Sequence, residues 1–401
     1  MDIVVQKFGG TSVGDMAKIR HVAEIVASEY AHNPVVVVVS AMAGETNRLV
    51  NYTGSFTILR SNTAALQEYD AIVAAGEQVA VGLLCLALMQ IGLKARSYLG
   101  WQLPLLTNSE YSRGRIVDVN VEPLVKSLEN GVIPIVAGFQ GVYNERIITL
   151  GRGGSDTTAT AIAAKIDAKR CDIYTDVDGV FTADPKIVTK AQQLREVSYE
   201  DMLEMSALGA KVLHPRAAVM AMKYHLNVRI LSTFNNKCGG TILRAQKMEE
   251  EFVTAITSSS GIASITLCNL NQQPEVVALV IDSLASYNIA VDMIIHHPIT
   301  NNFVFTVSKE YVVSAENALK KLKNKYYGEI IVDGDIAKVS IIGIGMKSNL
   351  HVVQKVFRIL NEHHISTMMF NAFETRISLF VKTEHSESAV CALHSGFNLG
   401  L

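Results

Sequence analysis

The stretch Arg146-Ile147-Ile148-Thr149-Leu150-Gly151-Arg152-Gly153-Gly154-Ser155-Asp156 joins an apolar strand candidate to a helix candidate at residues 157–165. The loop therefore delivers free backbone N–H groups at a helix N-terminus, where negative charge is favoured. Arg152 adds a planar fork suited to a carboxylate or phosphate, and Asp156 stands where an N-cap acceptor is expected. Glycine-rich strand-to-helix turns also occur without a ligand, so the loop alone leaves both interpretations open.

The chain on both sides of this loop alternates short β-branched runs with helical patterns up to about residue 243. Strands are expected at residues 3–5, 35–39, 132–137, 173–175 and 228–231, and helices at 19–30, 77–89 and 217–224. Continuous apolar strands alternating with helices predict an α/β fold, a mostly parallel sheet with helices on both faces. Ligands in such sheets collect at the carboxyl ends of the strands.

A duplication follows the glycine pair at residues 239–240. Residues 262–267 resemble 336–341, the helix at 276–284 resembles that at 352–360, and further strands are expected at 303–307 and 376–381. Each copy predicts a ferredoxin-like βαββαβ module. We expect a catalytic domain at 1–243, a linker at 244–260 and two modules at 261–332 and 333–401.

Composition narrows the classes of partner. In 401 residues, 36 basic and 38 acidic side chains give a net charge of −2, which offers no electrostatic reason for binding nucleic acid or an anionic membrane. The five cysteines lack CxxC spacing and are interpreted as packing residues in a reducing compartment.

The apolar run 79–89 is shorter than the ~20 residues of a membrane span and predicts a buried helix. The N-terminus has no signal-peptide pattern, because residues 3–5 lead directly into charged and glycine residues, so a cytoplasmic protein is expected.

A second candidate anion site follows the first strand at Lys7-Phe8-Gly9-Gly10. A lysine and backbone N–H groups can converge on phosphate there, although neither GxxxxGK[ST] nor GxGxxG is present. An exposed surface lysine is the alternative interpretation.

The third candidate is the acidic and hydroxyl-rich segment from Thr175 to Lys186, which leaves the strand at 173–175 and could clasp a nucleotide. A calcium loop and a plain Asp/Gly turn are the alternatives. EF-hand spacing is not met, because Lys186 stands where the twelfth-position glutamate is required.

These segments together resemble the aspartate kinases of the amino-acid kinase family. The resemblance rests on KFGGTSVGD at 7–15, SAM at 40–42, GEQ at 76–78, RIVDV at 115–119, GFQG at 138–141, LGRGGSDTTAT at 150–160 and YTDVDGVFTADP at 174–185. It covers the whole chain, because the duplicated region matches two C-terminal ACT domains. It implies ATP-dependent phosphorylation of the aspartate side-chain carboxylate, with Mg²⁺ carried by ATP rather than by a protein metal site.

The resemblance also implies roles for individual residues. Lys7 and Asp156 would be catalytic, Arg152 would grip the substrate α-carboxylate, and Glu77 would face its ammonium. The remaining substrate residues would be Ser40, Thr46, Phe139, Gly153, Gly154 and Ser155, although Thr46 is equally suited to an ordinary helix start. Lys7, Phe8, Gly9, Gly10, Thr175, Asp176, Phe181, Asp184, Lys186, Lys211 and Val212 would bind ATP. His214, before a proline, is left out as a structural helix-start residue.

Several positions depart from the family pattern. Phe181 replaces a more usual tyrosine, which keeps stacking but loses a hydroxyl, and Lys186 replaces an arginine. The resemblance implies that ACT domains pair into a homodimer or larger assembly and bind lysine or threonine. First ACT domains of the family typically read DKPG before the helix and carry a Gln-Asn pair after the second strand. This chain has Gln272-Gln273-Pro274-Glu275 and His296-His297 instead, which weakens the effector pattern. The second module has Leu350-His351 in place of Pro-Gly but keeps Glu374. Regulation is therefore expected to be altered or lost.

Two other functions stay open at this point. One is a sibling amino-acid kinase acting on another carboxylate, and the other is a catalytically silent ACT sensor of amino acids. A silent sensor would be indicated by loss of Lys7, Arg152 or Asp184, and all three are present.

Overall fold

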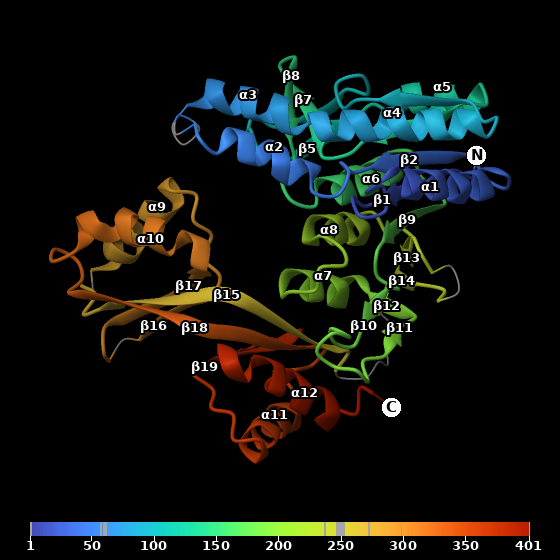
Figure 1. The fold of residues 1–401 in the computed structure, drawn as a ribbon. Coiled ribbons are helices and arrows are strands. Elements are labelled where there is room, and N and C mark those ends of the chain that lie inside the picture. The colour runs from blue at the N-terminus through green and yellow to red at the C-terminus, as the bar shows by residue number, and fades with distance from the viewer. Residues whose placement is uncertain are drawn as a thin grey trace. The chain divides into compact units, whose positions relative to one another are not determined.

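The chain forms two compact units, which Figure 1 shows as ribbons. A computed structural model describes residues 2–56, 58, 62–235, 238–245, 253–271, 273–297 and 299–400. The first unit comprises residues 1–181 and 192–250, and the second comprises 182–191 and 251–401. Part of the linker expected at 244–260, residues 246–252, lies outside the described residues.

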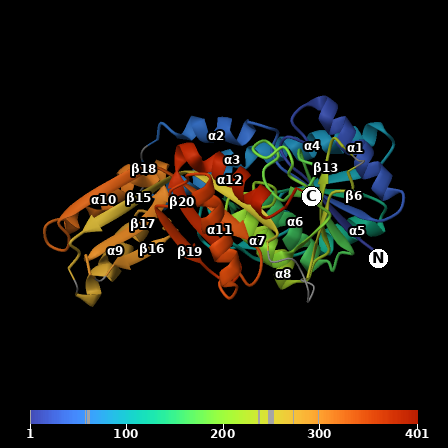
Figure 2. The ribbon, with the colours of Figure 1, turned by 90° about the horizontal axis from the view of Figure 1, so that it is seen from below.

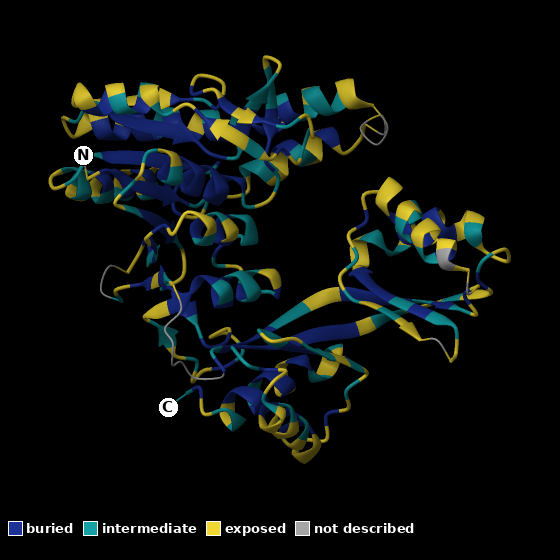
Figure 3. Cartoon of the chain, turned by 180° about the vertical axis from the view of Figure 1, so that it is seen from behind, coloured by how far each residue is buried: buried dark blue, intermediate teal, exposed yellow. Residues whose placement is uncertain are grey.

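An eight-stranded sheet forms the centre of the first unit. Its order is β12 (Glu196–Ser198), β14 (Thr241–Arg244), β13 (Val228–Ser232), β9 (Arg170–Thr175), β1 (Val4–Phe8), β2 (Val35–Val39), β6 (Ile133–Ala137) and β3 (Ala95–Tyr98). Neighbours are parallel except β13 and β14, so the expected mostly parallel sheet is confirmed. Every residue of β1, β2 and β6 is buried, as expected for strands covered on both faces. Figure 3 shows these buried strands between helices with exposed outer surfaces.

Helices cover both faces of this sheet. α1 (Met16–Tyr30) and α4 (Ala75–Gln90) pack with Phe8 and alternate valines of β2 into one core. α6 (Gly154–Lys165) lies against β1, β2 and β9 on the other face, where Lys7 points. The remaining helices of this unit are α2 (Glu45–Thr53), α3 (Thr63–Val73), α5 (Glu122–Glu129), α7 (Tyr199–Ala207) and α8 (Pro215–Lys223).

The run 79–89 is helical as expected, but it is not buried on every side. Val79, Leu86 and Met89 of α4 are 52, 65 and 51% exposed. The sequence of α4 is apolar all round, so no periodicity marked the outward face. The helical stretch Thr63–Gln90 is long and apolar enough to cross a membrane, but 56% of its apolar window is buried. It therefore resembles a core helix and is weak evidence of a membrane span.

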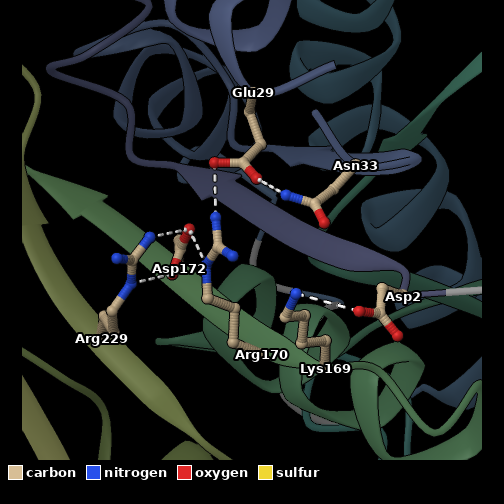
Figure 4. Close-up of polar contacts among 7 residues, drawn as sticks. All are labelled: Asp2, Glu29, Asn33, Lys169, Arg170, Asp172 and Arg229. Carbon is tan, nitrogen blue, oxygen red and sulfur yellow. Dashed lines mark hydrogen bonds and ion pairs between the residues drawn. The ribbon is translucent and has the colours of Figure 1, made fainter. Parts of the chain in front are cut away.

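Buried charges tie α1 to the sheet (Figure 4). Asp172 on β9 is fully buried and accepts two hydrogen bonds from Arg229 on β13, from Nε and Nη2, each 2.7 Å long. Arg170 donates to the same carboxylate at 3.1 Å and also pairs with Glu29 of α1. Because a buried carboxylate is costly without partners, this network is needed to keep Asp172 in the sheet.

A smaller sheet of β5 (Ile116–Val119), β4 (Leu105–Thr107), β7 (Gln140–Tyr143) and β8 (Arg146–Thr149) also belongs to the first unit. β7 and β8 form an antiparallel hairpin that leads through residues 150–153 into α6. The strand–loop–helix expected around the glycine loop is thereby confirmed. β10 (Val180–Phe181) and β11 (Gln193–Leu194) form a separate antiparallel pair.

The second unit contains a six-stranded antiparallel sheet (Figure 2). Its order is β16 (Ile294–His297), β17 (Asn302–Ser308), β15 (Ala255–Cys268), β18 (Glu329–Ile342), β20 (Arg376–Lys382) and β19 (Met369–Ala372). Helices α9 (Pro274–Ser286) and α10 (Val312–Leu319) follow β15 and β17, whereas α11 (Leu350–Glu362) and α12 (Ser386–Gly396) follow β18 and β20. The two copies thus repeat the same order of elements, each around its own core.

The expected boundaries at 260/261 and 332/333 fall inside strands. β15 begins at Ala255, within the expected linker, and its Ile256 lies in the core of the second copy while Ile265 lies in that of the first. β18 likewise runs from 329 to 342 beside the whole of β15. Because each 14-residue strand serves both cores, the composition shift does not mark where the modules divide.

Candidate active site

The glycine-rich loop turns sharply between β8 and α6. Gly151 and Gly153 adopt left-handed backbone angles, with φ of 73° and 67°, and the Gly154 N–H donates to Gly151 O at 3.0 Å. Gly153 is the N-cap of α6, so Ser155 and Asp156 lie in its first turn. The expectation of Asp156 as N-cap is wrong, because the left-handed Gly153 starts the helix earlier. Free N–H groups of this first turn still make a suitable anion site.

Lys7 and Asp156 form a buried ion pair at the carboxyl end of β1. Lys7 Nζ lies 2.6 Å from Asp156 Oδ1, and their side chains are only 10 and 12% exposed. The alternative of Lys7 as an exposed surface lysine is therefore wrong. Asp156 Oδ2 also accepts the backbone N–H of His214 at 3.3 Å. A buried cation held by a second charged group at a strand end is a typical arrangement for charge stabilisation in phosphoryl transfer.

The two glycines after Phe8 allow close approach of the backbone. A Cβ on Gly10 would lie 2.8 Å from Ala41 O, and one on Gly9 would lie 3.5 Å from Lys7 Nζ. Phe8 itself points away from Lys7, because its ring stacks on Tyr174 in the core with centroids 4.6 Å apart. Only the backbone of Phe8 is thus available to a ligand.

Glu77 is the buried carboxylate on the expected substrate side. It is 2% exposed, and Oε1 accepts the Ala41 N–H at 3.0 Å, whereas Oε2 has no hydrogen-bond partner among the described residues. Burial raises the pKa of Glu77 to about 7, and the Ala41 hydrogen bond partly opposes this shift. An unpartnered oxygen on a carboxylate that titrates near neutrality suits a cationic ligand group.

Other expected substrate residues lie on the surrounding loops. Phe139 has a φ of 66° and its backbone lies against Gly154, where a Cβ would come within 3.0 Å of the Phe139 Cα. Ser155 likewise lies against Gly138, where a Cβ would come within 2.6 Å of Ser155 Oγ. Ser40 follows β2 and donates its N–H to Phe8 O at 3.1 Å, while Arg152 is exposed. Thr46 is half-buried in the first turn of α2, whose N-cap is Gly44, so its hydroxyl is not needed for capping.

The expected nucleotide residues fall into two groups. Thr175 and Asp176 at the end of β9, Phe181 on β10, and Lys211 and Val212 before α8 belong to the first unit, where Asp176 and Lys211 are exposed. Asp184 and Lys186 belong to the second unit, where both are exposed and Asp184 Oδ1 accepts the Lys186 N–H at 2.9 Å.

Two residues support the glycine loop: His214, whose expected role at a helix start is confirmed, and Arg216, which was missed. His214 is the N-cap of α8, and its ring occupies the space next to Gly153, where a Cβ would come within 2.0 Å of it. Arg216 donates to Leu150 O at 2.5 Å and to Gly114 O at 2.9 Å, which fixes the entry to the loop. Burial lowers the pKa of His214 although Asp156 opposes this, so the ring is neutral near pH 7. The His-Pro pair predicted the helix start, but no sequence signal marked the packing on Gly153.

We expect Gly153→Ala to disrupt this loop. The new methyl group would clash with the His214 ring and would also require a left-handed alanine, so kcat/KM should fall roughly 10²-fold as the loop is displaced. Gly92→Ala is the matched control, because Gly92 has a φ of 85° and nothing within 4 Å of a Cβ. It should lose only about 1 kcal/mol of stability and little activity. Equal steady-state rates for the two variants would show that the contact with His214 is unimportant.

Across the parts of the chain that are described, no group of three or more His, Cys, Asp or Glu side chains is placed to hold a metal ion.

Comparison with known proteins identifies the family. The model of the amino acid kinase family matches residues 2–232, and an ACT domain model matches residues 339–397. The chain belongs to the amino acid kinase family. Similar proteins include aspartate kinase Ask_LysC of Stutzerimonas stutzeri, 39% identical over 407 residues, and the aspartokinase of Thermus thermophilus, 40% identical over 408 residues. These alignments cover all of this chain and 98 and 99% of the relatives.

Solved structures show the same fold. E. coli aspartokinase III in complex with aspartate and ADP, in the R-state, matches with a TM-score of 0.84 at 27% identity over 98% of this chain and 99% of that one. The same enzyme in complex with lysine and aspartate, in the T-state, matches with a TM-score of 0.79 at 27% identity, over 99 and 100% of the two chains.

Proposed function

We propose that this protein is an aspartate kinase, which transfers the γ-phosphoryl group of ATP to the side-chain carboxylate of L-aspartate. The product, 4-phospho-L-aspartate, opens the route to lysine and diaminopimelate, threonine and methionine. The observation that carries the proposal is the buried Lys7–Asp156 pair beside the N-terminus of α6, in a chain whose full-length relatives are named aspartate kinases.

The reaction needs positioning and charge neutralisation more than proton transfer. Lys7, Gly9 and Gly10 hold the transferring phosphoryl group, and Asp156 orients the Lys7 ammonium. The aspartate side chain is ionised at neutral pH and attacks phosphorus without a general base. Arg152, which is exposed on the glycine loop, grips the α-carboxylate in bidentate fashion, and the buried Glu77 accepts the ammonium.

The remaining expected residues complete the two halves of the site. Ser40, Thr46, Phe139, Gly153, Gly154 and Ser155 surround the amino acid. Thr175, Asp176, Phe181, Asp184, Lys186, Lys211 and Val212 bind the nucleotide, with Phe8 contributing its backbone. ADP in the E. coli enzyme supports ATP as the phosphoryl donor. Mg²⁺ arrives with ATP and is held mainly by phosphate oxygens and water.

ADP formation with L-aspartate, L-glutamate and N-acetylglutamate tests this assignment. An aspartate kinase releases ADP with L-aspartate alone, and a sibling kinase releases it with one of the other two carboxylates. A silent amino-acid sensor releases none with any of them. Either of the last two results would overturn the proposal.

Activity should depend on the ionisation of Glu77. Its pKa of about 7 means that acidification from pH 8 to pH 6 converts most of the carboxylate to the neutral acid, which cannot pair with an ammonium. The KM for aspartate should therefore rise roughly tenfold over this range. Glu77→Gln should have a raised KM that no longer changes with pH. A wild-type KM that stays constant from pH 8 to pH 6 would contradict the role of Glu77.

The second unit supports assembly and effector binding in this proposal. The protein forms a homodimer or larger assembly through its ACT modules and works in the cytoplasm. The E. coli enzyme binds lysine, so lysine and threonine are the effectors to test. His296 and His297 on the edge strand β16 and Leu350-His351 at the start of α11 replace the usual effector pattern.

We expect weak or absent feedback inhibition. Lysine and threonine are each titrated against activity at fixed aspartate, and most of the rate should remain at millimolar effector. The reason is that Gln272-Gln273-Pro274-Glu275 replaces the DKPG of the family, whose aspartate would hold an effector ammonium. Strong inhibition by lysine below 1 mM would contradict this expectation.

A further inference from the structure

Residues 182–191, here called the inserted segment, interrupt the first unit in sequence but pack within the second. The segment leaves β10 at Phe181 and returns to β11 at Gln193, and these two strands pair within the first unit. It carries Asp184 and Lys186, which the proposed function assigns to the nucleotide.

Apolar side chains of the inserted segment lie in the core of the second ACT module. Ala183 and Val188 are 4 and 6% exposed and belong to the same cluster as Val356, Val390 and Leu393 of α11 and α12. The backbone is held as well, because Ile256 of β15 donates its N–H to Thr182 O at 2.8 Å. The segment is therefore a structural part of the module, although it lies outside the module in sequence.

A buried histidine fixes the first residue of the segment. His394 on α12 is 1% exposed, and its Nε2 lies 2.9 Å from Thr182 Oγ1. The same hydroxyl lies 3.4 Å from Leu399 O, so it can donate to the carbonyl and accept from the imidazole. Burial lowers the pKa of His394, which keeps the ring neutral and suited to one such hydrogen bond.

Between these anchors the segment makes a tight turn. Asp184 O accepts the N–H groups of Ile187 and Val188, each at 2.9 Å, and the Asp184 side chain accepts that of Lys186. The buried residues Thr182, Ala183 and Val188 thus bracket the exposed Asp184 and Lys186 within seven residues. A shift of the anchor at Thr182 would be transmitted directly to both exposed side chains.

We infer that His394 is a positioning residue for nucleotide binding, which acts through Thr182 to hold Asp184 and Lys186 in place. The inference rests on the proposed function, in which these two side chains contact ATP. The buried hydrogen bond and the packed turn that carry this role both lie within the second unit.

Thr182→Val in the full-length protein tests this inference, because it removes the hydroxyl and keeps the shape of the side chain. The KM for ATP should rise about five- to tenfold, while the KM for aspartate stays within about twofold. Thr182→Ser keeps the hydroxyl and should restore the wild-type value. His394→Ala should reproduce the split between the two KM values if it folds, as judged by thermal unfolding.

A control variant separates positioning from general weakening of the module. Ser340 and Ser378 share a buried hydrogen bond of 3.0 Å between β18 and β20 in the same module. Ser378→Ala should lower the Tm by an amount similar to Thr182→Val without changing the KM for ATP. An equal rise in KM for both variants, or an unchanged KM in folded Thr182→Val, would overturn the inference.

Asp184→Asn distinguishes failure of the inference from failure of the site assignment. If it raises the KM for ATP, adding Thr182→Val should raise it further by less than Thr182→Val does alone, since only the effect through Lys186 is left. If Asp184→Asn raises this KM but Thr182→Val does not, the assignment stands and the inference fails. If neither variant changes it, both fail.

Discussion

Lys7→Ala should lower kcat about 10²- to 10³-fold, the effect of losing one preorganised group that stabilises charge in a transition state. Lys7 Nζ is the buried cation at the carboxyl end of β1, held 2.6 Å from Asp156 and next to the backbone of Gly9. Phosphoryl transfer spreads negative charge over the oxygens of the transferring group, and a cation in a buried site stabilises that charge more strongly than one in water. Steady-state kinetics at saturating ATP and aspartate measure the loss.

Lys165→Ala is the matched control for this prediction. Lys165 is on α6 as Asp156 is, but its ion pair with Asp118 is at the surface, with side chains 49 and 54% exposed. Its removal should leave kcat almost unchanged. Thermal unfolding of Lys7→Ala must be measured as well, because the variant leaves Asp156 with one partner fewer. Near-normal turnover by folded Lys7→Ala would refute the catalytic role of Lys7.

Arg229→Leu should destabilise the first unit by about 3 kcal/mol, the low end of the range for breaking a buried ion pair by removing one partner. Asp172 would lose both hydrogen bonds from Arg229 and keep the single bond from Arg170 (Figure 4). A fully buried carboxylate cannot replace these bonds with water, so the cost falls on the folded state. Denaturant unfolding measured at pH 7 gives the change.

Lys169→Ala provides the comparison, because Lys169 and Asp2 form a pair with side chains 48 and 72% exposed. Its loss should change stability by less than about 1 kcal/mol. If both variants lost the same small amount, the network of Asp172, Arg170 and Arg229 would not hold β9 and β13 together in the way described.

The sequence predicted the parts of the molecule that depend on local pattern. Runs of β-branched residues predicted the parallel strands of the first unit, and clustered glycines predicted the loop between β8 and α6. Two of these glycines adopt left-handed backbone angles in the structure. The pairing of Lys7 with Asp156 was not predicted from the residues, although both were expected in one site. They are 149 positions apart, and only the sheet and α6 bring them together.

Features built from distant contacts were not predicted. His214 packs on Gly153, and Arg216 bonds to Leu150 and Gly114, through side chains that carry no periodic or spacing signal. The inserted segment was expected in the catalytic domain because it follows β10, yet Ala183 and Val188 are buried with residues about 200 positions later. The modules were expected to divide between strands, whereas β15 and β18 each serve two cores.

The chemical identity of the product tests the central proposal most directly. The wild-type protein should be incubated with ATP, Mg²⁺ and hydroxylamine, which captures an acyl phosphate as its hydroxamate, in separate reactions with L-aspartate, L-glutamate and N-acetylglutamate. The proposal predicts 4-aspartyl hydroxamate with L-aspartate and no hydroxamate with the other two. No hydroxamate with L-aspartate, or a larger yield with either other carboxylate, would contradict it.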